Sequence, residues 1–337
     1  MDAIKEITES DRTQTQGLTR LKKFDTRQLF RLFVDGQHQK KYQGWKGYEK
    51  NEPHSLRAIL NGLCLVLKNF DIRSGLRSAY LIDLHRTCML HVQSRVESTS
   101  PGDFRFTPSL SPLNKGKATL ENIHELLELR TGDDTIVFGT PGFRKRAENL
   151  NAEEVFNAIQ EKGFVDYRSW YPLLDPDQRQ ARDKKKSVVH FYVVKHYIQM
   201  CYALKVDAIV ETFNDRMRSA TSDTERLAQI AWVTRNLKLL HPFPDGNTRT
   251  ISCLLLNQLL MNHGFDPVLL YNPNLDCQCS LAQWTQELQK GMAAFNTLLN
   301  NPEDELYGLR ISDLTDEEHA YFLRSASELI GLLQSGP

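Results

Sequence analysis

Nine consecutive residues, His-Pro-Phe-Pro-Asp-Gly-Asn-Thr-Arg from His241 to Arg249, combine side chains that suit phosphate chemistry. The imidazole of His241 can take a proton, and the carboxylate of Asp245 can hold a divalent cation. The backbone amides that follow Gly246 can line an anion site, and the guanidinium of Arg249 can pair with phosphate oxygens. The stretch therefore predicts a site that binds phosphate groups and accepts a proton.

Apolar helical runs lie on both sides of these nine residues. One run ends at Leu240 and the next begins at Thr250. The second helix would point its N-terminus, and hence its partial positive charge, back at the loop. A capped turn between two core helices is the alternative interpretation. It explains Pro242, Gly246 and Asn247, but it does not explain a histidine, an aspartate and an arginine together.

The stretch resembles the signature of the Fic family, His-x-Phe-x-(Asp/Glu)-Gly-Asn-Gly-Arg-x-x-Arg. The positions that match at the family's spacing are His241, Phe243, Asp245, Gly246, Asn247 and Arg249. Two positions depart, because Thr248 replaces the second glycine and Ser252 replaces the final arginine. The resemblance covers about residues 120–300 of the chain.

The resemblance implies an enzyme, a protein adenylyltransferase that moves AMP from ATP onto a Ser, Thr or Tyr hydroxyl of a target protein. It implies that His241 is the catalytic general base and that Asp245 is the metal ligand, holding Mg²⁺ or Mn²⁺ at the donor phosphates. The residues that it assigns to nucleotide and phosphate binding are Gly246, Asn247, Thr248 and Arg249. Phe243 is interpreted as an anchor that holds the loop in the core.

The two departures leave the donor open. In the family the final arginine binds the terminal phosphate of ATP, and Ser252 carries no charge. Donors of UMP, phosphocholine or phosphate, and removal of AMP, are alternatives within the same fold. A Fic domain that only binds a nucleotide or a protein is an alternative of another class. His241 and Asp245 argue against it, because a pure binder needs neither a base nor a metal ligand.

The family's inhibitory helix carries a glutamate in a (Ser/Thr)-x-x-x-Glu-(Gly/Asn) pattern, which is absent from this sequence. Glu121-Asn122 and Glu148-Asn149 follow Lys117 and Arg144 at that spacing, not a serine or threonine. The sequence therefore predicts an enzyme without this restraint, or a donor without a terminal third phosphate.

Composition excludes several classes of protein. The 337 residues carry 42 Lys plus Arg and 42 Asp plus Glu, and this balance argues against a nucleic-acid binder with a broad basic surface. Six cysteines within mostly apolar runs indicate a reducing compartment. No secretory leader is visible, and no apolar run reaches the roughly 18–20 residues of a transmembrane segment. A cytoplasmic protein is expected. By resemblance, a bacterial toxin or an effector translocated into a host cell is also expected.

The expected fold is mainly α, a Fic-type helical bundle with a small β-hairpin flap and an N-terminal helical region. Helices are predicted at 54–70, 76–96, 120–129, 151–163, 187–205, 222–240, 250–263 and 316–333, with the hairpin at 133–142. His85 and His91 are interpreted as packed or surface histidines. Apolar content predicts that the helix at 187–205 is central and buried.

Residues 97–118 are rich in Pro, Gly and Ser and are interpreted as a linker. This predicts an accessory or target-recognition region at 1–115, a catalytic domain at 116–300 and a helical extension at 301–337. Gly142-Phe143-Arg144 is a weak match to a Gly-x-Tyr-Arg element that often lies near the family's flap. Arg144 is therefore a candidate substitute for the missing final arginine.

Overall fold

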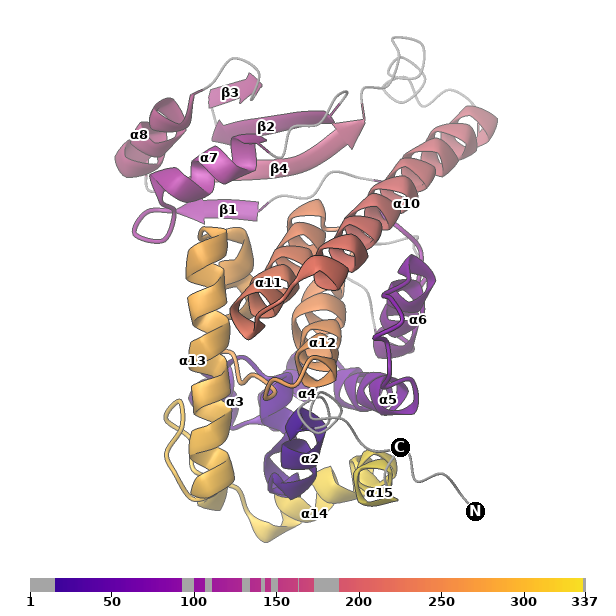
Figure 1. Cartoon of the computed structure of the whole chain (residues 1–337), viewed down its shortest axis with the longest axis vertical. Coiled ribbons are helices and arrows are strands. Elements are labelled where there is room, and N and C mark those ends of the chain that lie inside the picture. Colours follow the sequence, from indigo (N-terminus) through magenta and orange to yellow (C-terminus); the bar gives the residue numbers. More distant parts are fainter. Residues whose placement is uncertain are drawn as a thin grey trace.

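The computed structural model describes residues 16–92, 100–106, 111–128, 134–140, 143–146, 151–162, 164–172 and 188–335. The predicted mainly α fold is confirmed (Figure 1). The N-terminal elements are α2 (Gln16–Lys23), the 3-10 helix η1 (Thr26–Leu32), α3 (Gly36–Tyr42), α4 (Trp45–Asn51), α5 (Ser55–Lys68) and α6 (Ser78–Cys88). The middle elements are β1 (Ser111–Asn114), α7 (Leu120–Glu128), β2 (Asp134–Thr140), β3 (Phe143–Arg146), α8 (Ala152–Lys162) and β4 (Phe164–Pro172).

The elements after the sheet include the two helices that flank the signature loop. They are α10 (Val188–Ser219), α11 (Asp223–Leu240), the π-helix η3 (Thr248–Leu255), α12 (Leu256–Asn262), η4 (Pro273–Cys277), α13 (Leu281–Asn300), η5 (Ile311–Asp313), α14 (Asp316–Ser325) and α15 (Ser327–Ser335). The run predicted as one helix at 316–333 is thus two helices that meet at Ala326.

The predicted hairpin is present as β2 and β3, which pair antiparallel with Val137 opposite Arg146 and Thr140 opposite Phe143. It belongs to a four-stranded antiparallel sheet of order β1-β4-β2-β3. Figure 1 shows this sheet with α7 and α8 at one end of the molecule and α2, α14 and α15 at the other. The turn residue Gly142 lies outside the described residues. The prediction missed β1 and β4. Because these two strands pair on the β2 side of the hairpin, the hairpin is the outer half of a larger sheet.

A small hydrophobic cluster connects the sheet end of the molecule to the helical body. Ile123 of α7 and Ile159 of α8 are fully buried in it. Leu239 of α11 and Cys277 of η4 belong to the same cluster. Leu237 of α11 instead lies in the main core. Because one helix contributes to both clusters, the sheet end is attached directly to the helix that precedes the signature loop.

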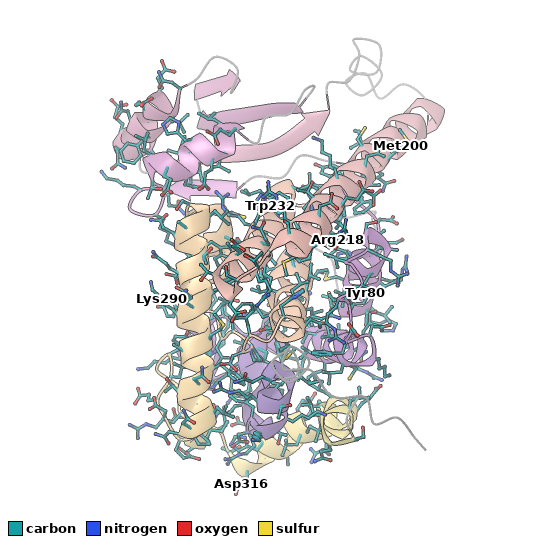
Figure 2. All side chains as sticks on the ribbon, in the orientation of Figure 1. Tyr80, Met200, Arg218, Trp232, Lys290 and Asp316 are labelled. Carbon is teal, nitrogen blue, oxygen red and sulfur yellow. The ribbon has the colours of Figure 1, made fainter. Side chains whose placement is uncertain are left out.

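The main core joins the N-terminal helices, the signature region and the C-terminal helices. Fully buried side chains include Ile59 of α5, Leu254 of η3 and Leu260 of α12, and Phe322 of α14 packs in the same cluster. Tyr80 of α6, labelled in Figure 2, donates a hydrogen bond of 2.7 Å to Gln258 of α12. The division at residue 115 into an accessory region and a catalytic domain stays a prediction. In the structure, residues before and after this position pack in the same hydrophobic core.

Much of the predicted linker at 97–118 is part of the packed structure where it is described, although residues 115–117 form an exposed turn. Residues 111–114 form β1, and Phe104 is buried with its ring 5.5 Å from that of Phe243. The amide of Arg105 donates 2.8 Å to the carbonyl of Pro242. The linker interpretation is therefore wrong for these residues. Its Pro and Gly residues mark turns within a segment that the core holds in place.

Helix α10 is confirmed and extends to Ser219, but its burial was overestimated. Ile198, Tyr202 and Val206 repeat at spacing four and are buried against the body. Met200, labelled in Figure 2, and Leu204 are 47% and 60% exposed. Within the part of the chain that the structure describes, no helix is long and apolar enough to cross a membrane.

Candidate active site

Helix α11 ends directly at His241. The capping box of Ser222 and Glu225 that starts this helix is present, as the sequence predicted. Leu240 is the last helical residue, and His241 adopts a left-handed conformation with φ 51° and ψ 58°. The amide of His241 donates 3.0 Å to the carbonyl of Leu237, which closes the helix. The imidazole therefore stands at the end of a rigid, largely buried helix.

The surroundings of His241 keep its imidazole neutral. The side chain is half-buried, and burial together with the charges of Arg105 and Lys238 holds the pKa of His241 well below its usual value. Arg105 also donates 3.2 Å from Nη1 to the carbonyl of His241. A neutral imidazole is the form that can accept a proton, so the geometry and the electrostatics both fit a general base.

The loop after His241 is closed by hydrogen bonds from its own residues. Asn247 donates 2.7 Å from its side chain to the carbonyl of Phe243 and accepts 3.1 Å from the amide of Phe243. Asp245 accepts 2.8 Å at Oδ1 from the amide of Gly246. The Asn247 side chain thus fixes the loop, and its contact with phosphate stays a prediction.

Phe243 anchors the loop in the core, as predicted. Its side chain is fully buried, and its ring lies 3.8 Å from the ring of His85 at an interplanar angle of 2°. Phe104 covers it further, with ring centroids 5.5 Å apart. The residues beside Phe243 therefore project from a fixed base.

The helix that follows the loop opens in a π-helical conformation. Asn247 is its N-cap and η3 runs from Thr248 to Leu255. The amide and the hydroxyl of Thr250 each bond to the carbonyl of Gly246 at 3.0 Å. A helix leaves its first backbone amides without intrahelical partners, and such amides attract anions. The predicted phosphate site therefore has its helix N-terminus beside Asp245.

Thr248, the first departure from the family signature, takes part in a buried polar cluster. Lys238 of α11 is 2% exposed and donates 2.6 Å from Nζ to the Thr248 hydroxyl. Lys238 and Thr248 both donate to Oδ1 of Asn274, at 3.2 and 3.1 Å. The hydroxyl of Thr248 therefore links the start of η3 to a buried ammonium group at the end of α11.

Ser252, the second departure, is 1% exposed and donates 3.1 Å from its hydroxyl to Oδ2 of Asp276. Asp276 is fully buried on η4, and the ammonium of Lys238 lies 3.9 Å from the same Oδ2. Burial raises the pKa of Asp276 despite this cation. Position 252 thus faces a buried acidic group, and its side chain contributes no positive charge to the loop.

Arg249 is held by the N-terminal region. Its side chain forms an ion pair with Glu52 and donates 2.5 Å from Nε to the hydroxyl of Tyr48 on α4. Nη1 lies 3.0 Å from the sulfur of Met89. These contacts tie the start of η3 to the N-terminal region, and the phosphate contact of Arg249 stays a prediction.

The side chains at the loop suit a metal ion that binds together with the phosphate groups of a substrate. Among the described residues no three His, Cys, Asp or Glu side chains lie close enough to form a metal cage. Asp245 supplies one half-buried carboxylate beside the N-terminus of η3. Mg²⁺ is commonly held by one or two carboxylates together with substrate phosphates. Asp245 therefore suits Mg²⁺ or Mn²⁺ bound to a diphosphate.

The structure places the six predicted site residues in the signature loop and at the start of η3, and it adds partners that the sequence did not indicate. Lys238 could have been suspected, because it interrupts the apolar run Leu237 to Leu240 three residues before His241. Glu52 and His85 carry no such signal, since they reach the site only through the fold. Arg144 lies on β3 opposite Gly139, and its side chain is outside the described part.

Comparison with known proteins finds a similar curated protein, the phosphocholine transferase AnkX of Legionella pneumophila. The two are 29% identical over an alignment of 273 residues, and the match covers 77% of this chain. The chain corresponds to 27% of the length of that relative. No family model matches the chain.

Proposed function

We propose that this chain is a Fic-type transferase that moves phosphocholine from CDP-choline onto a hydroxyl group of a target protein. The observation that carries the choice of donor is the buried contact between Ser252 and Asp276. The family signature places at position 252 the arginine that binds the terminal phosphate of ATP. A diphosphate-linked donor has no third phosphate and needs no such arginine. The similarity to a phosphocholine transferase supports the same donor.

The proposed reaction exchanges one phosphorus–oxygen bond for another. The acceptor hydroxyl transfers its proton to the neutral imidazole of His241 while its oxygen bonds to the phosphorus of the phosphocholine group. The bond from that phosphorus to the CMP oxygen breaks, and CMP leaves with the electron pair. The positive end of η3 would stabilise the charge on the phosphate oxygens. Positioning and electrostatics supply most of the catalysis in transfers of this kind.

The proposed metal ligand is Asp245, which would hold Mg²⁺ or Mn²⁺ together with the donor's phosphates. The bound ion would neutralise charge on the diphosphate oxygens. The chain's own contribution is to keep the carboxylate in place, and the hydrogen bond from Gly246 to Asp245 Oδ1 does this directly.

Transfer of AMP from ATP is the second candidate. The observation in its favour is the ammonium of Lys238, which lies 2.6 Å from the hydroxyl of Thr248 at the start of η3. A cation at this point could meet a third phosphate if the Thr248 contact opened. We also propose, from the resemblance to the Fic family, that the acceptor hydroxyl belongs to a target protein. On the same basis, we propose that the chain is delivered into a host cell as a bacterial effector.

The test is a comparison of donors on the His241→Ala protein, which should bind a donor without consuming it. Calorimetry with Mg²⁺ should show tight binding of CDP-choline and similar, weaker binding of ATP and ADP. A charged hydrogen bond contributes roughly 1.5–3 kcal/mol to binding. An enzyme that binds the third phosphate through such a bond would therefore have an affinity for ATP about ten- to a hundredfold higher than for ADP. Such a preference, or mass spectrometry of wild-type products that finds AMP on the acceptor, refutes the phosphocholine proposal.

A further inference from the structure

His85 lies on α6 against the back of the signature loop. Its side chain is 3% exposed. The imidazole ring is nearly parallel to the ring of Phe243, with centroids 3.8 Å apart and an angle of 2° between the planes. The sequence predicts that His85 is a packed or surface histidine. The packing part is confirmed, but both ring nitrogens also make specific hydrogen bonds.

The two hydrogen bonds of His85 determine its tautomer. The amide of Gly102 lies 2.8 Å from Nδ1, and an amide only donates, so Nδ1 carries the lone pair. Nε2 lies 3.0 Å from the carbonyl of Asp245, and a carbonyl only accepts, so Nε2 carries the hydrogen. The ring is therefore a neutral bridge that accepts from Gly102 and donates to Asp245.

This bridge controls the peptide group between Asp245 and Gly246. Its carbonyl accepts from His85, and its amide donates 2.8 Å to Oδ1 of the Asp245 side chain. The orientation of the peptide plane thus fixes the direction of the carboxylate. Rotation of this peptide would break both hydrogen bonds, and the carboxylate would lose the donor that holds Oδ1.

We propose that His85 is a positioning residue that orients the metal-binding carboxylate of Asp245 through the peptide bond to Gly246. The inference rests on the proposed function, because it takes Asp245 as the metal ligand. It adds a role for the N-terminal region, since α6 then supplies part of the support of the metal site. Removal of a residue that orients a metal ligand typically lowers metal affinity by about 10- to 100-fold.

Three substitutions separate the functions of the His85 ring. His85→Gln can place an amide N–H near the position of Nε2 and keep the bond to Asp245. His85→Asn can accept from Gly102 at the position of Nδ1 but is too short to reach the loop. His85→Phe keeps the stacking on Phe243 and loses both hydrogen bonds. Thermal unfolding of each protein shows which variants remain folded.

The readout is binding of Mn²⁺, followed by electron paramagnetic resonance in the His241→Ala background. Titrations with CDP-choline and with ATP present give the affinity whichever donor is correct. Relative to the His241→Ala parent protein, the Phe and Asn variants should bind Mn²⁺ at least about tenfold more weakly. The Gln variant should bind Mn²⁺ with nearly the affinity of this parent. Equal affinities for folded Asn and Gln variants, or an unchanged Phe variant, overturn the proposal.

Two further results distinguish this inference from the proposed function. Nitrogen-15 NMR of the wild-type protein should show His85 neutral with its hydrogen on Nε2, and a hydrogen on Nδ1 overturns the inference whatever the enzyme does. If the parent binds Mn²⁺ with a donor but wild type modifies no acceptor, only the proposed function fails. If wild type transfers phosphocholine but the His241→Ala protein binds no Mn²⁺, the proposed transfer reaction stands, and the inference about His85 fails together with the proposed metal ligand.

Discussion

Gly246 allows the loop to pass close to α6, and replacing it with alanine should be costly for two reasons. The residue has a φ of +71°, a left-handed conformation that costs a residue with a Cβ about 1–2 kcal/mol. A Cβ at this position would also lie 2.4 Å from the sulfur of Met89. Overpacking of a core typically costs about 1–3 kcal/mol. We therefore expect Gly246→Ala to destabilise the protein by about 2–5 kcal/mol.

Gly116 is a matched control for the conformational part of this cost. Its φ is +82°, and a Cβ there would meet nothing within 4 Å. Gly116→Ala carries the same backbone penalty and the same change in the unfolded chain, but no clash. The difference between the two variants in urea unfolding should equal the overpacking term, about 1–3 kcal/mol.

A double-mutant cycle with Met89→Ala isolates the clash itself. If the Met89 side chain is the obstacle, Gly246→Ala should cost less in the Met89→Ala background than in wild type. Two results would refute the reasoning. One is equal destabilisation by Gly246→Ala and Gly116→Ala, and the other is an additive cycle. A one-ångström shift of Asp245 would also lower transfer by about a hundredfold. Gly246→Ala should therefore lose more activity than Gly116→Ala, in the same order as the losses of stability.

Three further changes test the site and the surrounding structure. His241→Ala should lower transfer by about 10²–10⁴ while circular dichroism and donor binding stay near wild type, and full activity would remove His241 as the base. Glu52→Gln breaks a mostly buried pair with Arg249 and should cost about 3 kcal/mol in urea unfolding, whereas Glu328→Gln, in an exposed pair with Lys68, should cost under about 1 kcal/mol. Burial lowers the pKa of His263 to about 4, below the value of about 6.5 in the unfolded chain, so its stabilising effect is present above pH 6.5 and is lost as the pH falls toward 4. His263→Gln should therefore flatten the loss of stability over this range, and parallel curves for variant and wild type would contradict the shift.

The signature loop and its flanking helices could be predicted because they depend on local sequence. The capping box at Ser222, the end of α11 and the bend at Gly246 are all set by neighbouring residues. The contacts of Arg249 could not be predicted, since Tyr48 lies 201 positions away in the chain. The sequence signature is the same whether the arginine at position 249 is free or paired with Glu52.

The same limit explains the errors outside the loop. Pro and Gly residues in 100–106 indicate turns, but only the fold reveals that Phe104 packs on Phe243. On α10 the exposed Met200 and Leu204 are as apolar as the buried positions, so periodicity overestimated the burial of this helix. Strands β1 and β4 form through pairing between distant segments, and pairing of this kind leaves little trace in local composition.

The contacts of Arg249 also constrain how this sequence can diverge and recombine. Glu52, Tyr48 and Met89 meet a residue of the signature, so a substitution at any of these positions changes the environment of the loop. Exchange of the N-terminal helices with those of a relative would separate these partners unless the matching residues came along. We expect homologous sequences to show covariation between position 249 and positions 48, 52 and 89, and chimeras joined near residue 115 to require transfer of the whole set.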